Sequence, residues 1–260
     1  QGKAEVTTYA LSQSRYGQPR EGHAVLVFVT EDFHRDTQVK DEGNDADDAV
    51  KILKLNRIQR FATGIYDYSL MTSVFTPRAR GVDPHTLKVS ASIQDWCGHA
   101  WSQLNLDGDR YRTTVHSYFE AEADSVTEIP AAFLEDEAFN VIRIDPNGLP
   151  NGKIEAVPAL FDARLRHHDI APRTASATTR EVEGGLREFE LRYDDGRVFA
   201  ITFEAAAPHR IESFREAVGD QETVARRTHR KQIAYWQHNQ RGDAPLRAEI
   251  GLEPSDIGRK

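Results

Sequence analysis

The chain has 260 residues, of which 39% are hydrophobic and 28% charged, and a net charge of −8 at neutral pH. These values are typical of a globular protein with one large or two smaller domains. The acidic balance argues against nucleic acid and against charge-driven binding to an anionic membrane as partners. No apolar run approaches the roughly 18 residues that a membrane-spanning helix needs, so we expect no transmembrane segment.

The single cysteine, Cys97, excludes an intramolecular disulfide. The sequence begins with Gln1 and contains one methionine, Met71. We therefore expect a processed product that has lost a leader segment.

Alternating and β-branched segments predict strands through the first half of the chain. They cover residues 4–17, 22–33, 51–77 with a break near Thr63–Gly64, 86–105 and 110–120. The acidic stretch 41–50 has no periodicity. It lacks the glycine and glutamate spacing of an EF-hand calcium loop, so a solvated surface loop is the preferred interpretation.

A helix is predicted over 130–144, because Pro130 suits the first helical position and apolar residues recur on one face. The Pro/Gly-rich stretch 146–150 is the best candidate boundary, dividing the chain into residues 1–146 and 147–260, or lying within one continuous domain. Further strands are predicted at 152–168 with an interruption at Pro158, and at 173–184, 186–204 and 209–217. A second helix is predicted over 220–240, and the last twenty residues are expected to be poorly ordered.

The segment 186–204 predicts a β-hairpin whose register can be derived. A two-residue loop would place Leu191 opposite Ala200, whereas a three-residue loop would place it opposite Phe199. The three-residue loop pairs apolar side chains on one face and gives Gly196 the left-handed position, so it is preferred.

Ten to twelve strands and about two helices predict a mainly β fold. We expect antiparallel curved sheets or half-barrels, similar to those of periplasmic lipoprotein carriers.

The stretch 94–101, QDWCGHAW, contains the first four letters of the disulfide isomerase motif Trp-Cys-Gly-His-Cys. Disulfide exchange needs a second sulfur, which Ala100 cannot supply. The alternating pattern also places Cys97 on a strand, and not at the helix N-terminus that activates such thiols. The sequence therefore argues against a redox site.

A metal site is a second interpretation of this stretch. On a regular strand Asp95, Cys97 and His99 point to one face, and a Cys/His/Asp set suits zinc. A two-residue loop at 107–108 would add His116 opposite His99, whereas a three-residue loop ending at Gly108 pairs His99 with Val115. The alternative is a packed strand with no metal, and we expect neither a bound metal nor another cofactor.

Aromatic residues are concentrated in the middle of the chain and could line an apolar pocket in a curved sheet. A nearby arginine could hold a ligand carboxylate or phosphate. A plain hydrophobic core is the alternative. The candidate ligand-binding residues are Arg57, Tyr66, Tyr68, Trp96 and Trp101.

The segments 3–33, 53–77, 92–101 and 158–168 resemble an uncharacterised family of predicted envelope proteins of Bacteroidetes and related bacteria. The motif Gln-x-Trp-Cys-Gly-His at Gln94–His99 is the most specific part of the resemblance. It implies a secreted or lipoprotein-type chain in the periplasm or outer envelope. Members sometimes carry the label "septum formation inhibitor Maf". This sequence does not support that label, because it lacks the α/β pattern of the Maf family.

Three functions remain open. The leading hypothesis is a non-enzymatic envelope protein that binds a small apolar or amphiphilic ligand, or an envelope protein, on a concave β surface. The second is a metal-dependent hydrolase that uses Asp95, Cys97 and His99. The third is a structural scaffold without a pocket.

Overall fold

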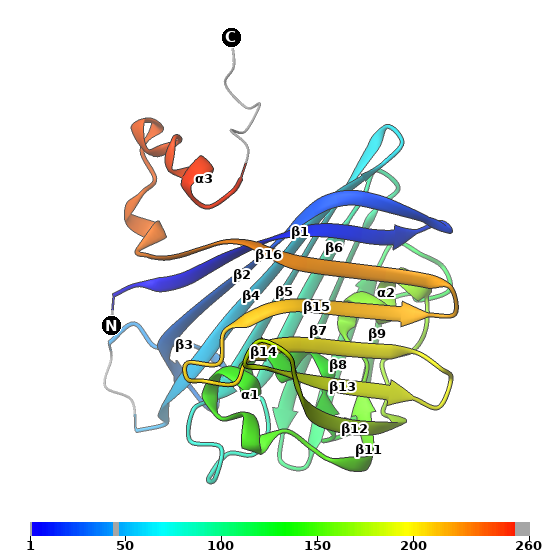
Figure 1. The fold of residues 1–260 in the computed structure, drawn as a ribbon. Coiled ribbons are helices and arrows are strands. Elements are labelled where there is room, and N and C mark those ends of the chain that lie inside the picture. The colour runs from blue at the N-terminus through cyan, green and yellow to red at the C-terminus, as the bar shows by residue number, and fades with distance from the viewer. Residues whose placement is uncertain (1, 44–46, 253–260) are drawn as a thin grey trace.

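The structure is a computed structural model and describes residues 2–43 and 47–252. Its strands form one 16-stranded sheet in the order β10-β11-β12-β13-β14-β15-β16-β1-β2-β4-β5-β6-β7-β8-β9, with β3 paired to β2. Every pairing is antiparallel except that of β10 with β11. The expected mainly β, antiparallel and curved architecture is confirmed (Figure 1).

The elements have the following bounds. The first eight strands are β1 (Ala4–Arg15), β2 (Gln18–His34), β3 (Val39–Lys40), β4 (Ala49–Thr63), β5 (Tyr66–Pro77), β6 (Lys88–Gln94), β7 (His99–Asp107) and β8 (Arg110–Ser117). The other eight are β9 (Ser125–Pro130), β10 (Phe133–Leu134), β11 (Gly152–Val157), β12 (Arg173–Val182), β13 (Leu186–Tyr193), β14 (Val198–Glu204), β15 (Ile211–Val218) and β16 (Gln221–Ile233). The helices are α1 (Ala138–Ile144), α2 (Leu160–Arg166) and α3 (Leu246–Glu249), with short 3-10 turns η1 (Glu135–Glu137), η2 (Pro146–Gly148), η3 (Tyr235–Gln237) and η4 (Arg241–Asp243).

The two edges of the sheet come together in space. β9 ends at Pro130 and β10 begins at Phe133, yet these strands lie at opposite ends of the strand order. Three residues of extended chain span only about 11 Å. The sheet must therefore curl round on itself, and Figure 1 shows β12 to β15 passing in front of β2 to β8.

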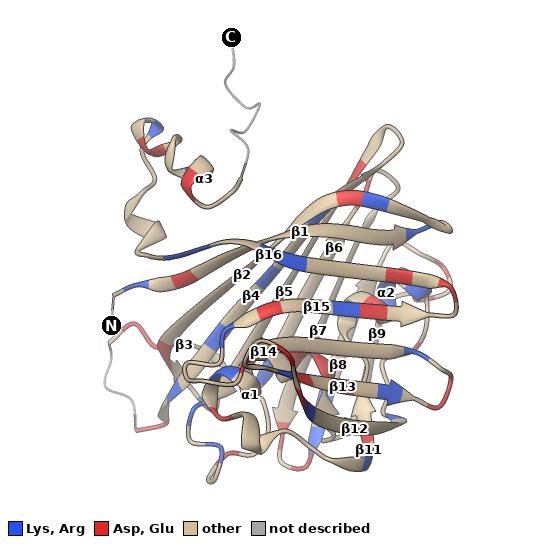
Figure 2. Ribbon diagram, viewed as in Figure 1, with Lys and Arg blue, Asp and Glu red and all other residues tan. Residues whose placement is uncertain are grey.

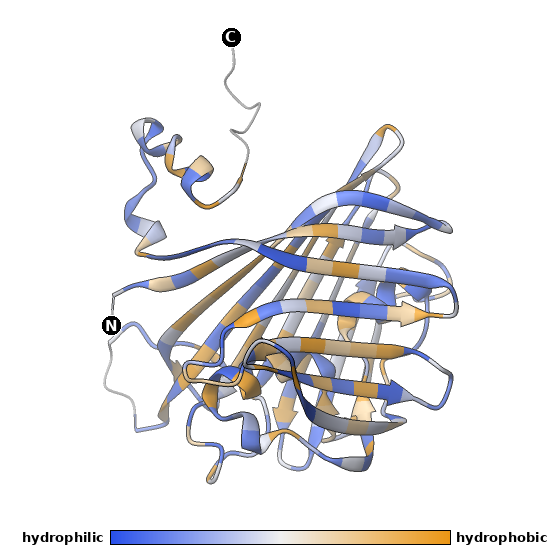
Figure 3. Ribbon diagram, in the orientation of Figure 1, coloured by the Kyte–Doolittle hydropathy of each residue, from blue (hydrophilic) through white to orange (hydrophobic). Residues whose placement is uncertain are grey.

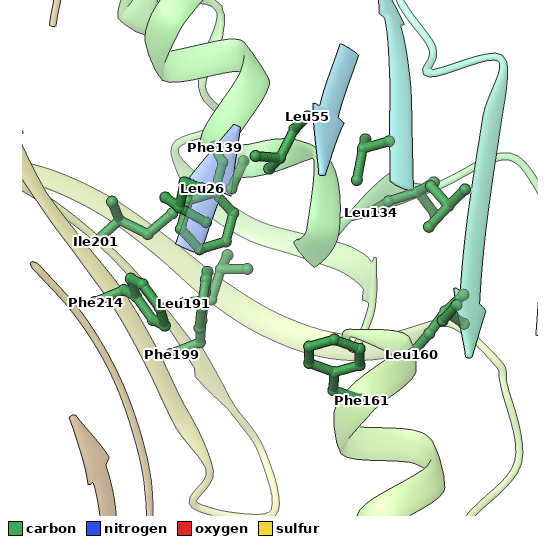
Figure 4. Close-up of a cluster of buried hydrophobic side chains, with 14 of the residues drawn as sticks. Leu26, Leu55, Leu134, Phe139, Leu160, Phe161, Leu191, Phe199, Ile201 and Phe214 are labelled. Carbon is green, nitrogen blue, oxygen red and sulfur yellow. The ribbon is translucent and has the colours of Figure 1, made fainter. Parts of the chain in front are cut away.

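The core lies inside this curl. Hydrophobic residues alternate along many strands, as Figure 3 shows. One cluster joins inward-facing residues of both layers with residues of α1 and α2, among them Leu26, Leu191 and Phe199 with Phe139 and Phe161 (Figure 4). The two helices therefore fill much of the concave interior.

The hairpin of β13 and β14 has the preferred register. Leu191 pairs with Phe199 and Phe189 with Ile201, and all four side chains are buried. Gly196 has a φ of 88°, the left-handed conformation expected for the turn. This prediction is confirmed.

The predicted helix over 220–240 is wrong. Residues Gln221–Ile233 form β16, a strand paired with β15 on one side and β1 on the other. Two neighbouring strands supply partners for its backbone groups, and this outweighs the moderate helix propensity of its Arg, Lys and Gln residues. The Gly219–Asp220 loop that joins it to β15 is itself a two-residue hairpin signal.

Two other segments differ in part from their predictions. The helix expected over 130–144 is confined to η1 and α1, because Phe133–Leu134 pairs with β11. The strand expected over 152–168 ends at Val157, and α2 follows Pro158. Proline suits the start of a helix, so it marks a change of element here.

The predicted acidic loop and the C-terminal segment that was expected to be poorly ordered both extend beyond the described residues. Within the acidic stretch 41–50, residues 44–46 lie outside the description, and Ala49 begins β4. Of the last twenty residues, 241–252 contain η4 and α3, while 253–260 lie outside the described part. Ile250 and Leu252 pack on the outward-facing valines of β1 and β2.

Candidate ligand-binding site

A cavity of about 340 Å³ lies between α2 and strands β6 to β9. Its position follows from the fold, since α2 enters the curled sheet but does not cover the inner face of its last strands. The volume is at the lower end of the range for small-molecule sites, roughly 300–1,000 Å³. Apolar side chains form much of its wall: Ile93, Ala100, Val115, Leu160, Ala163 and Ile170.

Polar groups gather in the same lining. Arg164 of α2 and Glu122 of the loop between β8 and β9 both line the cavity. The Arg164 guanidinium lies 3.3 Å from Glu122 Oε1 and 3.9 Å from the centre of the Phe119 ring. His167 Nδ1 is 2.8 Å from the same Glu122 oxygen. The lining therefore combines apolar side chains with a positively charged residue, Arg164, and a negatively charged residue, Glu122.

Arg164 has spare hydrogen-bonding capacity. Its side chain is 8% exposed. Its Nε is buried and has no hydrogen-bond partner within the described part of the chain. A buried donor without an acceptor is unfavourable, so Arg164 is incompletely satisfied by its present partners.

A buried ionic network holds α2 in place. Arg197 donates two hydrogen bonds to Glu135 of η1, at 2.5 and 2.7 Å, and a third to Asp162 of α2 at 2.9 Å. His168 lies 2.7 Å from the other Asp162 oxygen, and the Tyr193 hydroxyl donates to Glu135. Arg197 thus ties α2 to η1 from the turn before β14.

The network shifts the pKa values of two of its members, Asp162 and Tyr193. Burial raises the pKa of the Asp162 carboxyl, but the His168 hydrogen bond and the Arg197 charge outweigh it, so the pKa falls below its usual range. Burial raises the pKa of Tyr193 well above its usual value, and the nearby Glu135 charge adds to this. The charged form of Asp162 is therefore favoured by its surroundings.

Arg57 lies inside the curl but does not line this cavity. It is 1% exposed, its guanidinium stacks on Phe161 at 4.4 Å, and its Nη2 lies 3.6 Å from Asp136 Oδ1. None of its side-chain nitrogens has a hydrogen-bond partner among the described residues. Burial raises the pKa of Asp136 despite the opposing charge of Arg57.

The four aromatic candidates separate into two places. Tyr66, Tyr68 and Trp96 form a cluster with ring centres 5.8 Å apart for the two tyrosines and 6.4 Å apart for Tyr66 and Trp96. Trp101 is the one sequence-predicted ligand residue that lines the cavity. Its ring lies on the outer face of β7, where it stacks on His116 and its Nε1 donates to Ser90, so the ring itself does not face the cavity.

The metal candidates are not brought together. The expected strand over 86–105 is broken by a turn at residues 95–98, where Asp95 Oδ1 accepts from the backbone N–H groups of Cys97 and Gly98. Asp95, Cys97 and His99 therefore do not share a strand face, and Cys97 is exposed.

The register of the following hairpin matches neither alternative. Trp101 pairs with His116, and the loop is Gly108–Asp109. His116 interacts with Asp124 at 3.2 Å, and the carbonyl of His99 accepts from the N–H of Tyr118. In the described ranges, no three His, Cys, Asp or Glu side chains form a group that could hold a metal ion.

Most residues that line the cavity were not predicted from the sequence. Leu160, Ala163 and Arg164 lie in the stretch interpreted as a strand, where period-2 alternation hides their common helical face. The same error set His167 and His168 on opposite strand faces, whereas both line the cavity after α2. The apolar spacing at positions 160, 161 and 165, directly after Pro158, is the signal that indicates a helix.

A second hollow, of about 860 Å³, lies at the other end of the strands and is lined mainly by polar residues, such as Arg35, Asp83 and His85 of the loops and Arg112 of β8. It lacks a continuous apolar wall. The cavity beside α2 is therefore the stronger candidate site.

Comparison of the structure with solved structures finds a likeness over most of its length. A crystal structure of a β-barrel-like protein of domain of unknown function DUF1849, from Brucella abortus, matches with a TM-score of 0.52. The match covers 88% of this chain and 97% of that chain, at 10% sequence identity. The fold is β-barrel-like. At this identity the likeness establishes nothing beyond the β-barrel-like fold.

Comparisons of the sequence do not assign this β-barrel-like chain to a family. No protein-family model matches, and the search of curated proteins finds no match. Among the described residues, no helix is long and apolar enough to cross a membrane.

Proposed function

We propose that the protein binds a small amphiphile in the cavity between α2 and strands β6 to β9. The observation that carries the proposal is a cavity of about 340 Å³ that combines apolar side chains of β6, β7, β8 and α2 with the charged cluster of Arg164, Glu122 and His167. Such a combination is characteristic of small-molecule sites. The apolar wall would hold the ligand's hydrocarbon part.

The polar head is a carboxylate or a similar anion in this proposal. Arg164 is nearly buried and has a donor without an acceptor, and it already holds one carboxylate, that of Glu122. Ligand and Glu122 would compete for Arg164 and His167. No catalytic group is invoked, so the proposed role is binding without chemistry.

Filling the cavity tests this proposal. Thr127 and Val126 are neighbours on the edge strand β9, and both are exposed. Thr127 lines the cavity whereas Val126 does not, since successive strand residues face opposite sides. We expect Thr127→Phe to weaken decanoate binding about tenfold or more, and Val126→Phe to leave it unchanged.

The measurement is displacement of the fluorophore N-phenyl-1-naphthylamine by decanoate, with decanol and decylamine as competitors of equal chain length. Decanoate should compete best, and Arg164→Met should remove its advantage over decanol. Absence of fluorophore and decanoate binding by the unaltered protein, or equal effects of the two β9 variants, would contradict the proposal.

An extracytoplasmic location forms part of the same proposal and is supported by the resemblance to predicted envelope proteins. Fractionation of the producing cells tests it. Recovery of the native protein with the cytoplasmic fraction would refute this part and leave the ligand site to be judged by the binding experiment.

A further inference from the structure

Four connections at one end of the curled sheet each expose a large apolar side chain. The residues are Tyr16 between β1 and β2, Ile65 between β4 and β5, Trp96 between β6 and β7, and Tyr118 between β8 and β9; their exposed fractions are 58, 85, 69 and 72%. We call these four residues the rim.

The rim follows from the topology. Strands β1, β2, β4, β5, β6, β7, β8 and β9 are neighbours in this order, and all their pairings are antiparallel. Alternate connections therefore lie at the same end of the sheet. Figure 3 shows a hydrophobic tip on the hairpin of β4 and β5, and Figure 2 shows that this tip carries no charge.

Three of the rim side chains are held by contacts beneath them. The Tyr16 hydroxyl is 2.8 Å from that of Tyr68. The Trp96 ring packs on Tyr66. Tyr118 lies against Gly98, where an added Cβ would be 2.7 Å from the tyrosine ring. The rim is thus a preformed surface, and little ordering is needed when it binds.

Other hairpin tips of the sheet differ in chemistry. The tip between β13 and β14 contains Asp194 and Asp195, and the tip between β15 and β16 contains Asp220. Among the residues that the structure describes, the opposite end of β2 to β6 exposes Val39 and Val82 but no large aromatic side chain. Among these connections, those that carry the rim are the ones that expose tryptophan and tyrosine.

We propose that the rim docks on the surface of a lipid bilayer with zwitterionic headgroups. Tryptophan and tyrosine combine an apolar ring with a polar atom and favour the interface between lipid and water. An anionic surface is disfavoured, because the connections that carry the rim also contain acidic residues and the chain has a net charge of −8. These acidic residues are Asp95, Glu120, Glu122 and Asp124.

The rim and the cavity are close to each other. Ala121 and Glu122 line the cavity and belong to the same loop as Tyr118. Docking would bring this side of the cavity to the lipid surface. The proposal does not rest on the ligand site, since the rim exists whether or not the cavity is occupied.

Vesicle binding tests the proposal. Co-sedimentation with phosphatidylcholine vesicles should be seen at low and high salt, and should not improve when phosphatidylglycerol is added. We expect Ile65→Ser/Trp96→Ser to reduce partitioning about tenfold or more. The matched variant Val39→Ser/Val82→Ser, altered at the opposite end, should bind like the unaltered protein.

A second readout locates the contact. Cys97 is the single cysteine, is exposed and lies beside Trp96, so a fluorophore attached there reports on the rim. Its emission should shift to the blue with phosphatidylcholine vesicles and be quenched by lipids labelled near the headgroup. Unchanged circular dichroism and thermal midpoint would show that both variants are folded.

The proposal is overturned if the protein does not bind phosphatidylcholine vesicles, if binding needs phosphatidylglycerol, or if the two serine variants bind equally. None of these results bears on decanoate binding, so the two proposals can fail separately.

Discussion

At the residue scale, Arg57 is a buried cation without hydrogen bonds among the described residues. Its contacts are the rings of Phe139 and Phe161 and the carboxylate of Asp136. Desolvating an ion pair costs several kcal/mol per ion unless hydrogen bonds satisfy both partners. Arg57 and Asp136 are therefore a weak point of the interior, unlike the hydrogen-bonded network around Arg197.

A double-mutant cycle on this pair gives a prediction for stability. Asp136→Asn alone leaves Arg57 without its ion-pair partner and should lower the free energy of unfolding by about 3 kcal/mol. Arg57→Met/Asp136→Asn removes both charges and keeps an acceptor for the N–H of Leu160. We expect the double variant to be more stable than the unaltered protein by about 1–4 kcal/mol.

Urea unfolding at pH 7 is the measurement. A double variant that is clearly less stable than the unaltered protein would mean that the guanidinium has favourable partners, such as ordered water.

At the scale of elements, the hairpin of β13 and β14 was predictable because local chemistry decides it. An aspartate–glycine turn and apolar cross-strand pairs fix one register. The connection between β6 and β7 was missed because Asp95 and Gly98 form a turn inside a sequence that keeps its alternation. When a turn does not interrupt the alternation of apolar and polar residues, hydrophobic periodicity cannot reveal it.

Contact between β2 and β4 supplies a second stability prediction. An added Cβ at Gly22 would lie 2.2 Å from the carbonyl oxygen of Arg60 and 2.9 Å from Phe61 Cβ. Because both neighbours belong to β4, the strands must separate to admit it. We expect Gly22→Ala to cost about 1–3 kcal/mol.

The control is Gly81→Ala, where nothing lies within 4 Å of an added Cβ. It should change the free energy of unfolding by less than about 0.5 kcal/mol. Equal thermal midpoints for the two variants would contradict the close approach of β2 and β4.

At the scale of the whole molecule, both halves of the chain contribute to one sheet. β1 pairs with β16 from Ala4 to Ser12, and the Tyr9 hydroxyl donates to the carbonyl of Ile211. The main hydrophobic cluster also includes residues from both halves. Each half alone would expose a strand edge and part of this cluster.

We therefore expect the fragments 1–146 and 147–260 to lack cooperative unfolding when produced separately. Circular dichroism and thermal scans of each fragment are the measurement. Two fragments that each fold with a sharp transition would instead establish the boundary at 146–150 as a true domain division.

The sequence by itself determined the β class, the antiparallel character and the local hairpin of β13 and β14, because these depend on alternation and turn chemistry within a few residues. Of the residues that line the cavity it indicated Trp101 alone, whose ring faces away from the cavity. Tertiary structure decided that 221–233 is a strand, because β1 and β15 pair with it. It also decided where α2 lies, because the sheet curls until its edges come together between residues 130 and 133. It brought four turns that are distant in sequence into one rim, because alternate connections between antiparallel neighbours lie at the same end of the sheet.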